Sequence, residues 1–259
     1  MNIYTIKHNK LAFTALLLAL FLLPATVFCA ETAQEREDRR ISEQIRKTPS
    51  PLLYERLAVL RAGTAADAYA EWRRNKKTAS LQKAIYNAAS ACELSPQWSK
   101  PKVLLAEIYS EFSADKASLE LAVNLLIQAA ELDPANAPAR LLLAQNLMKL
   151  GRFWSAIEVY KQLFDESETM VTGINTAPLA LCYVMDGRVK AGADYFGLLR
   201  TKYPDKNGVA IALAVLKRHA GEKQVAKKLL NIKSKDKAEA DYIQTLLKQW
   251  DREDADEKR

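Results

Sequence analysis

Residues 179–204, which read LALCYVMDGRVKAGADYFGLLRTKYP, contain the unit that decides the fold of this chain. A Leu-Ala pair opens the stretch, Gly187 follows its leucine by eight residues, and Gly192 precedes Phe196 by four. Glycine readily adopts the left-handed conformation that ends a helix, and a small residue one turn before a large one lets two helices cross closely. Pro204 then stops the second helix. The stretch therefore predicts two helices joined by a tight turn.

The same pattern recurs through most of the chain. Leu-Ala pairs begin at Leu105, Leu143, Leu179 and Leu213, at successive spacings of 38, 36 and 34 residues. After each of the last three pairs, a glycine, a small residue and a large residue follow at constant distances: Gly151, Ala156 and Tyr160; Gly187, Gly192 and Phe196; Gly221, Ala226 and Leu230. Self-similarity at such a period indicates stacked structural repeats.

These units resemble tetratricopeptide repeats. The pattern of that family is matched by Leu179, Ala180, Tyr183, Gly192, Phe196 and Pro204. Its leading Trp is replaced in the four units by Lys102, Arg140, Thr176 and Ala210. The resemblance implies an all-α fold, an α-solenoid of stacked helix-turn-helix repeats, with units at about 99–136, 137–172, 173–206 and 207–236.

The segments outside these repeats differ in composition. Residues 31–50 alternate acids and arginines and are expected to form a charged linker. Residues 51–98 are expected to hold N-terminal helices, including a degenerate repeat. One apolar face in residues 237–250 predicts a helix that caps the open end of the stack. Residues 251–259 are expected to be a frayed, charged tail.

The first 30 residues have the organisation of an export signal. Lys7 and Lys10 precede the apolar run from Leu11 to Leu23, which is typical of a signal peptide. We therefore expect an exported, periplasmic protein. Two alternatives stay open: residues 11–30 are long enough to remain as a membrane anchor, and Cys29 is a potential lipid attachment site.

The charge distribution is that of an ordinary protein surface, and the cysteines are expected to be buried. The net charge is +7, and it falls to +5 without residues 1–30, from 36 basic and 31 acidic residues. The excess is spread along the chain without the dense basic stripe and interleaved aromatics of a nucleic-acid binder, so no nucleic-acid partner is expected. Cys92 and Cys182 lie among small and apolar residues, which predicts two packed free thiols.

No pattern in the sequence indicates catalysis. Beyond residue 30, His219 is the only histidine, and no nucleophile elbow, phosphate-binding loop or zinc-protease helix occurs. We predict no enzymatic activity, no catalytic or metal-ligating residue and no cofactor. His219 itself is expected near the end of a helix, where the helix dipole favours a basic residue.

The expected binding surface is a groove lined by the first helix of each repeat. In the tetratricopeptide family, first-helix positions that are not used for packing face this groove, which here gives Leu141, Gln145, Met148, Ala177, Leu181, Val184, Met185, Ile211 and Val215. Because the set is largely apolar, a peptide or amphipathic helix of another protein is the expected partner. A homodimer, coverage by the C-terminal helix, and the regulatory subunit of an envelope enzyme are the alternatives.

Overall fold

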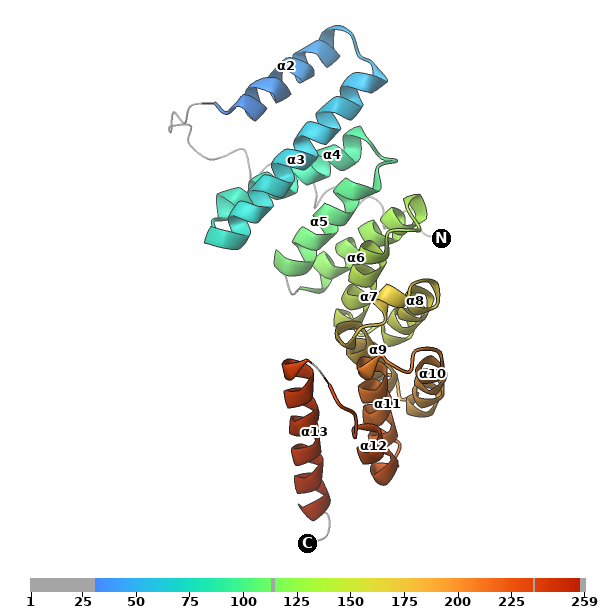
Figure 1. Ribbon diagram of the computed structural model, residues 1–259. Coiled ribbons are helices and arrows are strands. Elements are labelled where there is room, and N and C mark those ends of the chain that lie inside the picture. The colour runs from blue at the N-terminus through green and yellow to red at the C-terminus, as the bar shows by residue number, and fades with distance from the viewer. Residues whose placement is uncertain (1–30, 113–114, 235, 257–259) are drawn as a thin grey trace. The chain divides into compact units, whose positions relative to one another are not determined.

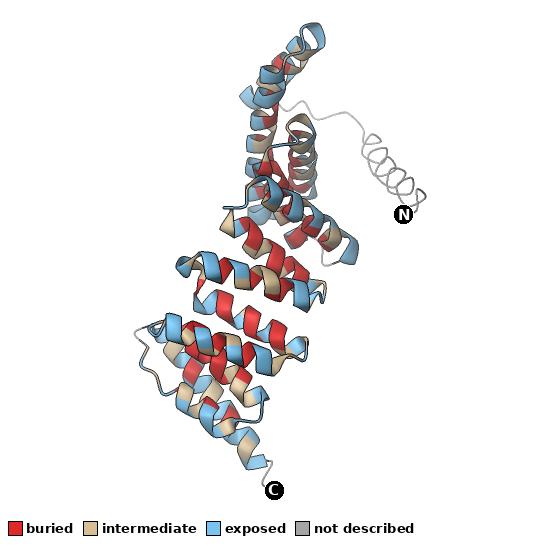
Figure 2. Ribbon diagram, turned by 90° about the vertical axis from the view of Figure 1, so that its right-hand side faces the viewer, coloured by how far each residue is buried: buried red, intermediate tan, exposed pale blue. Residues whose placement is uncertain are grey.

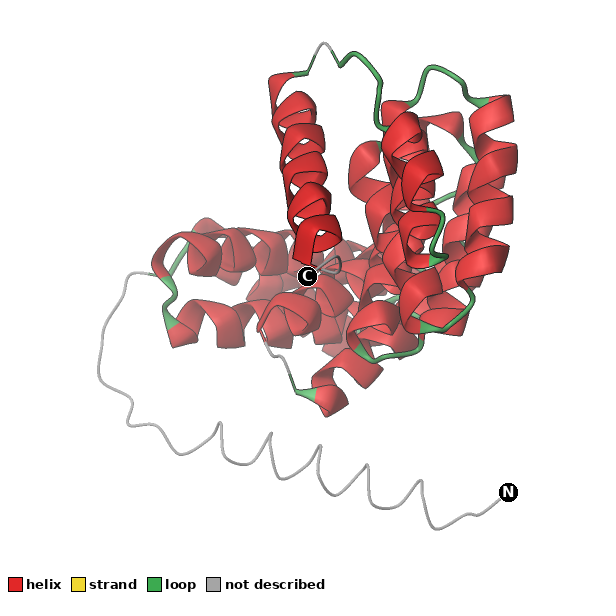
Figure 3. Ribbon diagram, turned by 90° about the horizontal axis from the view of Figure 1, so that it is seen from below, coloured by secondary structure: helices red, strands yellow, loops and turns green. Residues whose placement is uncertain are grey.

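The computed structural model describes residues 31–112, 115–234 and 236–256, and all regular structure in these residues is helical (Figure 1, Figure 3). The elements are α2 (Ala33–Lys47), α3 (Pro51–Asn75), α4 (Thr78–Leu94), α5 (Ser99–Phe112), α6 (Lys116–Leu132), α7 (Ala137–Lys149), α8 (Phe153–Glu166), the 3-10 helix η1 (Glu168–Met170), α9 (Gly173–Met185), α10 (Val189–Lys202), α11 (Asn207–His219), α12 (Lys223–Leu229) and α13 (Lys237–Asp256). The predicted all-α class is confirmed. The predicted signal segment, residues 1–30, lies outside the described residues.

The chain divides into two compact units, one ending at Arg40 and the other running from Ile41 to Arg259. The predicted linker, residues 31–50, is mostly the helix α2, which crosses this division. A capping box explains why so charged a segment is helical: Glu35 N–H donates to Thr32 Oγ1 at 3.2 Å, and Thr32 N–H donates to Glu35 Oε2 at 2.9 Å. This reciprocal pair supplies two of the acceptors that a helix N-terminus needs.

In the second unit, consecutive helices pack against one another from α3 to α12 (Figure 1). The first helices of neighbouring helix pairs also contact one another: α3 packs on α5, α5 on α7, and α9 on α11. The helix pairs α5–α6, α7–α8, α9–α10 and α11–α12 lie within residues 99–136, 137–172, 173–206 and 207–236, and the pair α3–α4 precedes them. The described chain is therefore an α-solenoid of stacked helix-turn-helix repeats.

The turns within the repeats have the predicted left-handed conformation. Gly151, Gly187 and Gly221 have φ angles of +73°, +73° and +83°. After each glycine, the chain bonds back to the first helix, as when Arg188 N–H donates to the carbonyl of Tyr183 at 2.9 Å. Between α3 and α4, Lys76 takes this role with φ +56°, a conformation that costs a non-glycine residue about 1 kcal/mol.

Two close approaches explain why small residues recur at fixed positions. A Cβ added to Gly192 would lie 2.6 Å from Cγ of Tyr183, so α10 crosses α9 at a distance that only glycine allows. Between repeats, a Cβ on Gly208 would lie 2.5 Å from Cα of Gly173, and Thr176 Oγ1 donates to the carbonyl of Gly208 at 3.1 Å. The small residues therefore fix both crossings.

The core forms three apolar clusters along the second unit, and Figure 2 shows the buried positions on the inward faces of the helices. Tyr160, Phe164 and Phe196 are fully buried in the largest of them. Truncating such a ring to alanine in a packed core costs about 3–5 kcal/mol. The small and large residues that define the repeat are thus the residues that form its core.

The C-terminal end of the described chain differs from the sequence expectation. The predicted capping helix extends through Trp250 to Asp256, so most of the segment expected to fray is helical. The reason is that Asp251, Glu253 and Asp254 pair with basic residues of α11 and α12. Pairing with basic side chains makes continuation of the helix favourable.

Candidate functional site

The apolar side of α9 is the most exposed part of the predicted groove. Ile174, Leu181 and Met185 are 83%, 50% and 57% exposed, and Ala177 is also exposed. The four residues are spaced by three, four and four positions, which places them on one side of a helix. We call this set the α9 face.

The opposite side of α9 is held rigidly. Leu179, Ala180, Cys182 and Tyr183 are buried, and the helix packs against α8, α10 and α11. Pro178 lies inside the helix and has no N–H, so the carbonyl of Ile174 lacks its usual helical donor. The α9 face therefore combines exposed apolar side chains with a backbone acceptor on a fixed element.

The remaining predicted groove residues on α7 and α9 are less exposed than the α9 face. Leu141, Met148 and Val184 are half-buried and pack against the main core cluster, and Gln145 is also half-buried. These four side chains are therefore less exposed than those of the α9 face. Ile174, in contrast, was absent from the sequence-based set, although it precedes Leu181 by seven residues, the spacing that signals a shared helix side.

The two predicted groove residues of α11 are not in an open groove, because α13 covers them. Ile211 and Val215 lie in an apolar cluster with Ala214, Ile243 and Trp250. Of the occupants considered from sequence, the C-terminal helix is the one that covers these two positions. The prediction of an open groove at Ile211 and Val215 is therefore wrong.

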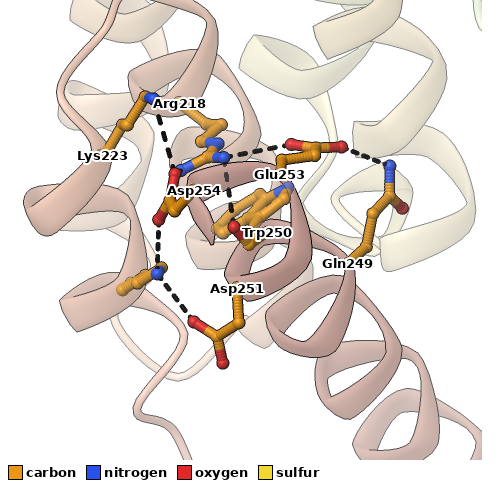
Figure 4. Close-up of polar contacts among 8 residues, drawn as sticks. Arg218, Lys223, Gln249, Trp250, Asp251, Glu253 and Asp254 are labelled. Atoms are coloured by element: carbon orange, nitrogen blue, oxygen red, sulfur yellow. Dashed lines mark hydrogen bonds and ion pairs between the residues drawn. The ribbon is translucent and has the colours of Figure 1, made fainter. Parts of the chain in front are cut away.

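A network of charged groups joins the C-terminal ends of α11 and α13 (Figure 4). Arg218 forms ion pairs with Asp254 at 2.7 Å and with Glu253 at 3.0 Å, and its guanidinium carbon lies 5.5 Å from the centroid of the Trp250 ring. Lys227 of α12 donates to Asp251 at 2.7 Å and to Asp254 at 2.6 Å. Hydrogen bonds from Lys227 and Arg218 hold the pKa of Asp254 well below its usual range.

Glu111 of α5 forms polar contacts with residues in and just after α3. Tyr69 donates its hydroxyl to Glu111 at 2.5 Å, and Arg73 and Lys76 lie 3.3 and 3.8 Å from the same carboxylate. Burial, and then this hydrogen bond, raise the pKa of Tyr69. The contacts join the helix pair α3–α4 to the pair α5–α6.

The cysteines and the histidine of the described chain show no sign of a reactive site. Burial raises the pKa of the Cys92 thiol to about 11 and that of Cys182 to about 12, so both are protonated near neutral pH and are poor nucleophiles. His219 is exposed at the last residue of α11, as expected. Within residues 31–112, 115–234 and 236–256, no group of three or more His, Cys, Asp or Glu is placed to hold a metal ion.

None of the helices in the described part of the chain combines the length and the apolar character needed to cross a bilayer. The potential membrane anchor, residues 11–30, lies outside the described residues.

Together, the repeated crossings, the left-handed turns and the exposed first-helix face define a helical-repeat solenoid. Residues 115–168, from the start of α6 to η1, match the family model described as tetratricopeptide repeat. The sequence resemblance to this family is thus supported for part of the chain. No curated protein matches the chain.

Several solved structures are similar to this chain, and one of them is of a tetratricopeptide-repeat protein. YrrB, described as a tetratricopeptide-repeat protein with an unusual peptide-binding site, is 14% identical, with 80% of this chain and 94% of YrrB covered at a TM-score of 0.50. MamA from Desulfovibrio magneticus RS-1 is 13% identical, with 64% and 90% covered and a TM-score of 0.48. PilF from Pseudomonas aeruginosa is 16% identical, with 66% and 73% covered and a TM-score of 0.47. At these identities, the likeness to YrrB supports the fold.

Proposed function

We propose that this chain is a non-enzymatic scaffold that binds a peptide or an amphipathic helix of another protein on the α9 face. The observation that carries the proposal is the exposure of Ile174, Leu181 and Met185 on a helix whose other side is fixed in the core. Exposed apolar residues gathered on one side of a rigid element are typical of interaction sites, whereas single exposed ones are ordinary.

The chemistry of the α9 face favours an apolar anchor from the partner. Methionine is flexible and polarizable, so Met185 can adapt to side chains of different shapes. A partner helix with apolar residues three and four positions apart would place them against Ile174 and Leu181. YrrB, of similar fold, is described as having a peptide-binding site, which is consistent with this function for a repeat stack.

We further propose that the scaffold acts in the cell envelope of a bacterium as an assembly factor. This part rests on the sequence of residues 1–30, with its basic start and apolar run. Fractionation of cells and N-terminal sequencing of the protein test it. A start near residue 31 in the periplasmic fraction supports a cleaved signal, and an intact N-terminus in the cytoplasmic fraction contradicts export.

Photo-crosslinking in the native cell tests the binding site. A photoreactive amino acid at Leu181 should give a discrete adduct with another protein, because this side chain is half exposed on the α9 face. The matched control is Leu198 on α10, an apolar residue that is 73% exposed outside that face.

The pattern of adducts decides between the candidate occupants. An adduct from Leu181 and not from Leu198 supports a partner-binding face, and mass spectrometry identifies the partner. An adduct of doubled mass favours the alternative, a self-associating protein. Equal labelling from both positions contradicts a specific site.

A further inference from the structure

The helix α13 occupies the position that the first helix of a further repeat would take. Asn207 donates to Glu239 at 2.8 Å at one end of α11, and Arg218 donates to the carbonyl of Trp250 at 3.4 Å at the other. Both pairs are 32 residues apart, as are Thr176 and Gly208, which join α9 to α11. The helices α11 and α13 therefore run parallel, and α13 uses the surface on which repeats stack.

The apolar contact beneath α13 has an open pocket beside it. Ile243 and Trp250 are the buried residues that α13 contributes. They share an apolar cluster with Ile211 and Ala214 of α11, Ala226 of α12 and Leu230, which follows α12. An open pocket of about 360 Å³ lies between α12 and α13, and it is lined by Leu230, Ile232, Ala240, Ile243 and Leu247 together with the polar Lys227, Asn231 and Gln244. Because this pocket is open, the contact between α12 and α13 is accessible to solvent along one edge.

Charge makes the contact selective for a particular kind of helix. On the receiving side, Arg218 of α11 and Lys223 and Lys227 of α12 surround the carboxylate of Asp254 at 2.7, 3.5 and 2.6 Å (Figure 4). The side chain of Arg218 is only 9% exposed. A helix suited to this surface therefore needs two apolar residues seven positions apart, as Ile243 and Trp250 are, and acids in the turn that follows.

We infer that the surface of α11 and α12 beneath α13 is a helix-binding site that accepts α13 of a second copy of this chain. The helix α13 itself carries the apolar spacing and the acidic turn that the site selects. Exchange of an identical helix replaces every contact with its equivalent, so it costs little beyond association itself. This site is separate from the α9 face and does not depend on the function proposed for that face.

Two complementary variants test the exchange. Trp250→Ala weakens α13 but leaves the receiving surface intact, and Arg218→Glu damages the receiving surface but leaves α13 intact. Both chains also carry Leu181→Glu, which removes association through the α9 face. Each chain alone should sediment as a monomer, and an equimolar mixture should form a one-to-one heterodimer, because one chain supplies the site and the other the helix.

Further measurements make the result decisive. A mixture that stays monomeric, with helicity retained in both chains by circular dichroism, would overturn the inference. So would a heterodimer that persists when the Arg218→Glu chain also carries Trp250→Ala, since that association would not use α13. If Trp250→Ala loses helicity, Asp254→Lys weakens the same helix at its acidic turn and takes its place.

A peptide of residues 237–256 with a fluorescent label provides a second readout. In the intact chain its own α13 competes at an effective concentration in the millimolar range, so the peptide should bind the Trp250→Ala chain at least about tenfold more tightly than the unaltered chain. Added salt should weaken the binding, because the acidic turn is partly exposed. Equal affinity for both chains would show that the peptide binds elsewhere and would contradict the inference.

Discussion

Single residues without a side chain determine how closely the helices of this stack approach. At Gly192, the space that a methyl group would need is taken by Cβ and Cγ of Tyr183, at 2.8 and 2.6 Å from the added atom. The position of Cβ is fixed by the backbone, so no rotation of the tyrosine side chain removes this clash. The close packing of α9 and α10 therefore depends on this one position.

Gly192→Ala should lower the free energy of unfolding by about 1–3 kcal/mol, because the added methyl group overpacks the crossing. The matched control is Gly197→Ala in the same helix, where an added Cβ meets nothing within 4 Å. That substitution should be neutral or stabilise by about 0.5–1 kcal/mol, since alanine is the better helix former. Urea denaturation measures both, and equal effects would contradict the steric explanation.

Sequence predicted these residues well but missed one that is exposed. The spacing of glycine, small and large residues gave the turns and crossings correctly, because each depends on contacts within one unit. Ile174 was missed, since it stands at the start of α9 where its side depends on where the helix begins. The beginning of a helix is the feature that sequence patterns locate least well.

At the scale of the helix, one side of α9 packs in the core, and the other side is the exposed face proposed for binding. Leu181→Glu should change the free energy of unfolding by less than about 0.5 kcal/mol, because half of the side chain is already exposed and nothing in the core rests on it. The same change should remove the protein adduct formed by a photoreactive group at Ile174. Loss of stability in place of loss of the adduct would show that the α9 face is part of the fold.

The helix α13 should respond to acid through its last turn. Asp254 and Glu253 have pKa values below their ordinary 3.8 and 4.5, Asp254 through Lys227 and Arg218, with Lys223 also facing it, and Glu253 through Gln249 and Arg218. Groups with depressed pKa values stabilise the folded state above those ordinary values, and the contribution is lost as pH falls further.

Asp254→Asn should therefore be less stable than the unaltered chain at pH 7, and the difference should shrink as the pH falls below 3.8. Denaturation of both chains across this range measures it. Asp205→Asn serves as the control, because Asp205 lies in the exposed turn between α10 and α11, away from this network. A difference that stays constant down to pH 2 would contradict the pairing.

Both flanking elements show why composition misled the prediction at this scale. Residues 31–50 and 251–259 are rich in charge, which suggests solvated chain when partners are unknown. In the structure, Thr32 and Glu35 cap α2, and Arg218 and Lys227 hold the end of α13. The cap was readable from Thr32 and Glu35, but the partners of α13 lie more than 20 residues away along the chain.

For the whole molecule, nearest-neighbour packing is what made the fold predictable. Each helix from α3 to α12 packs on the next one, and the larger contact of α9 with α11 joins neighbouring repeats, so a local pattern contains most of the information needed. The candidate site was less accessible to sequence, because coverage of Ile211 and Val215 depends on where α13 docks. That docking rests on contacts of Ile243 and Trp250 with another repeat, which no local pattern reveals.

The burial of Cys182 makes the central repeat observable by chemistry. This thiol is 0% exposed, and its raised pKa leaves it protonated, so a thiol reagent reacts only after α9 separates from its neighbours. With Cys29 replaced by serine, labelling at Cys182 should be far slower than at Cys92, which is only half-buried. Mass spectrometry resolves the two rates, and equal rates would contradict the packing.

The labelling rate at Cys182 therefore reports how often the stack opens around α9. A ligand on the α9 face that holds α9 in place would lower this rate, without any label attached to the ligand. Cells treated briefly with a thiol reagent would record this occupancy in the protein itself. The one buried sulfur atom in α9 thus converts a binding event into a difference of mass.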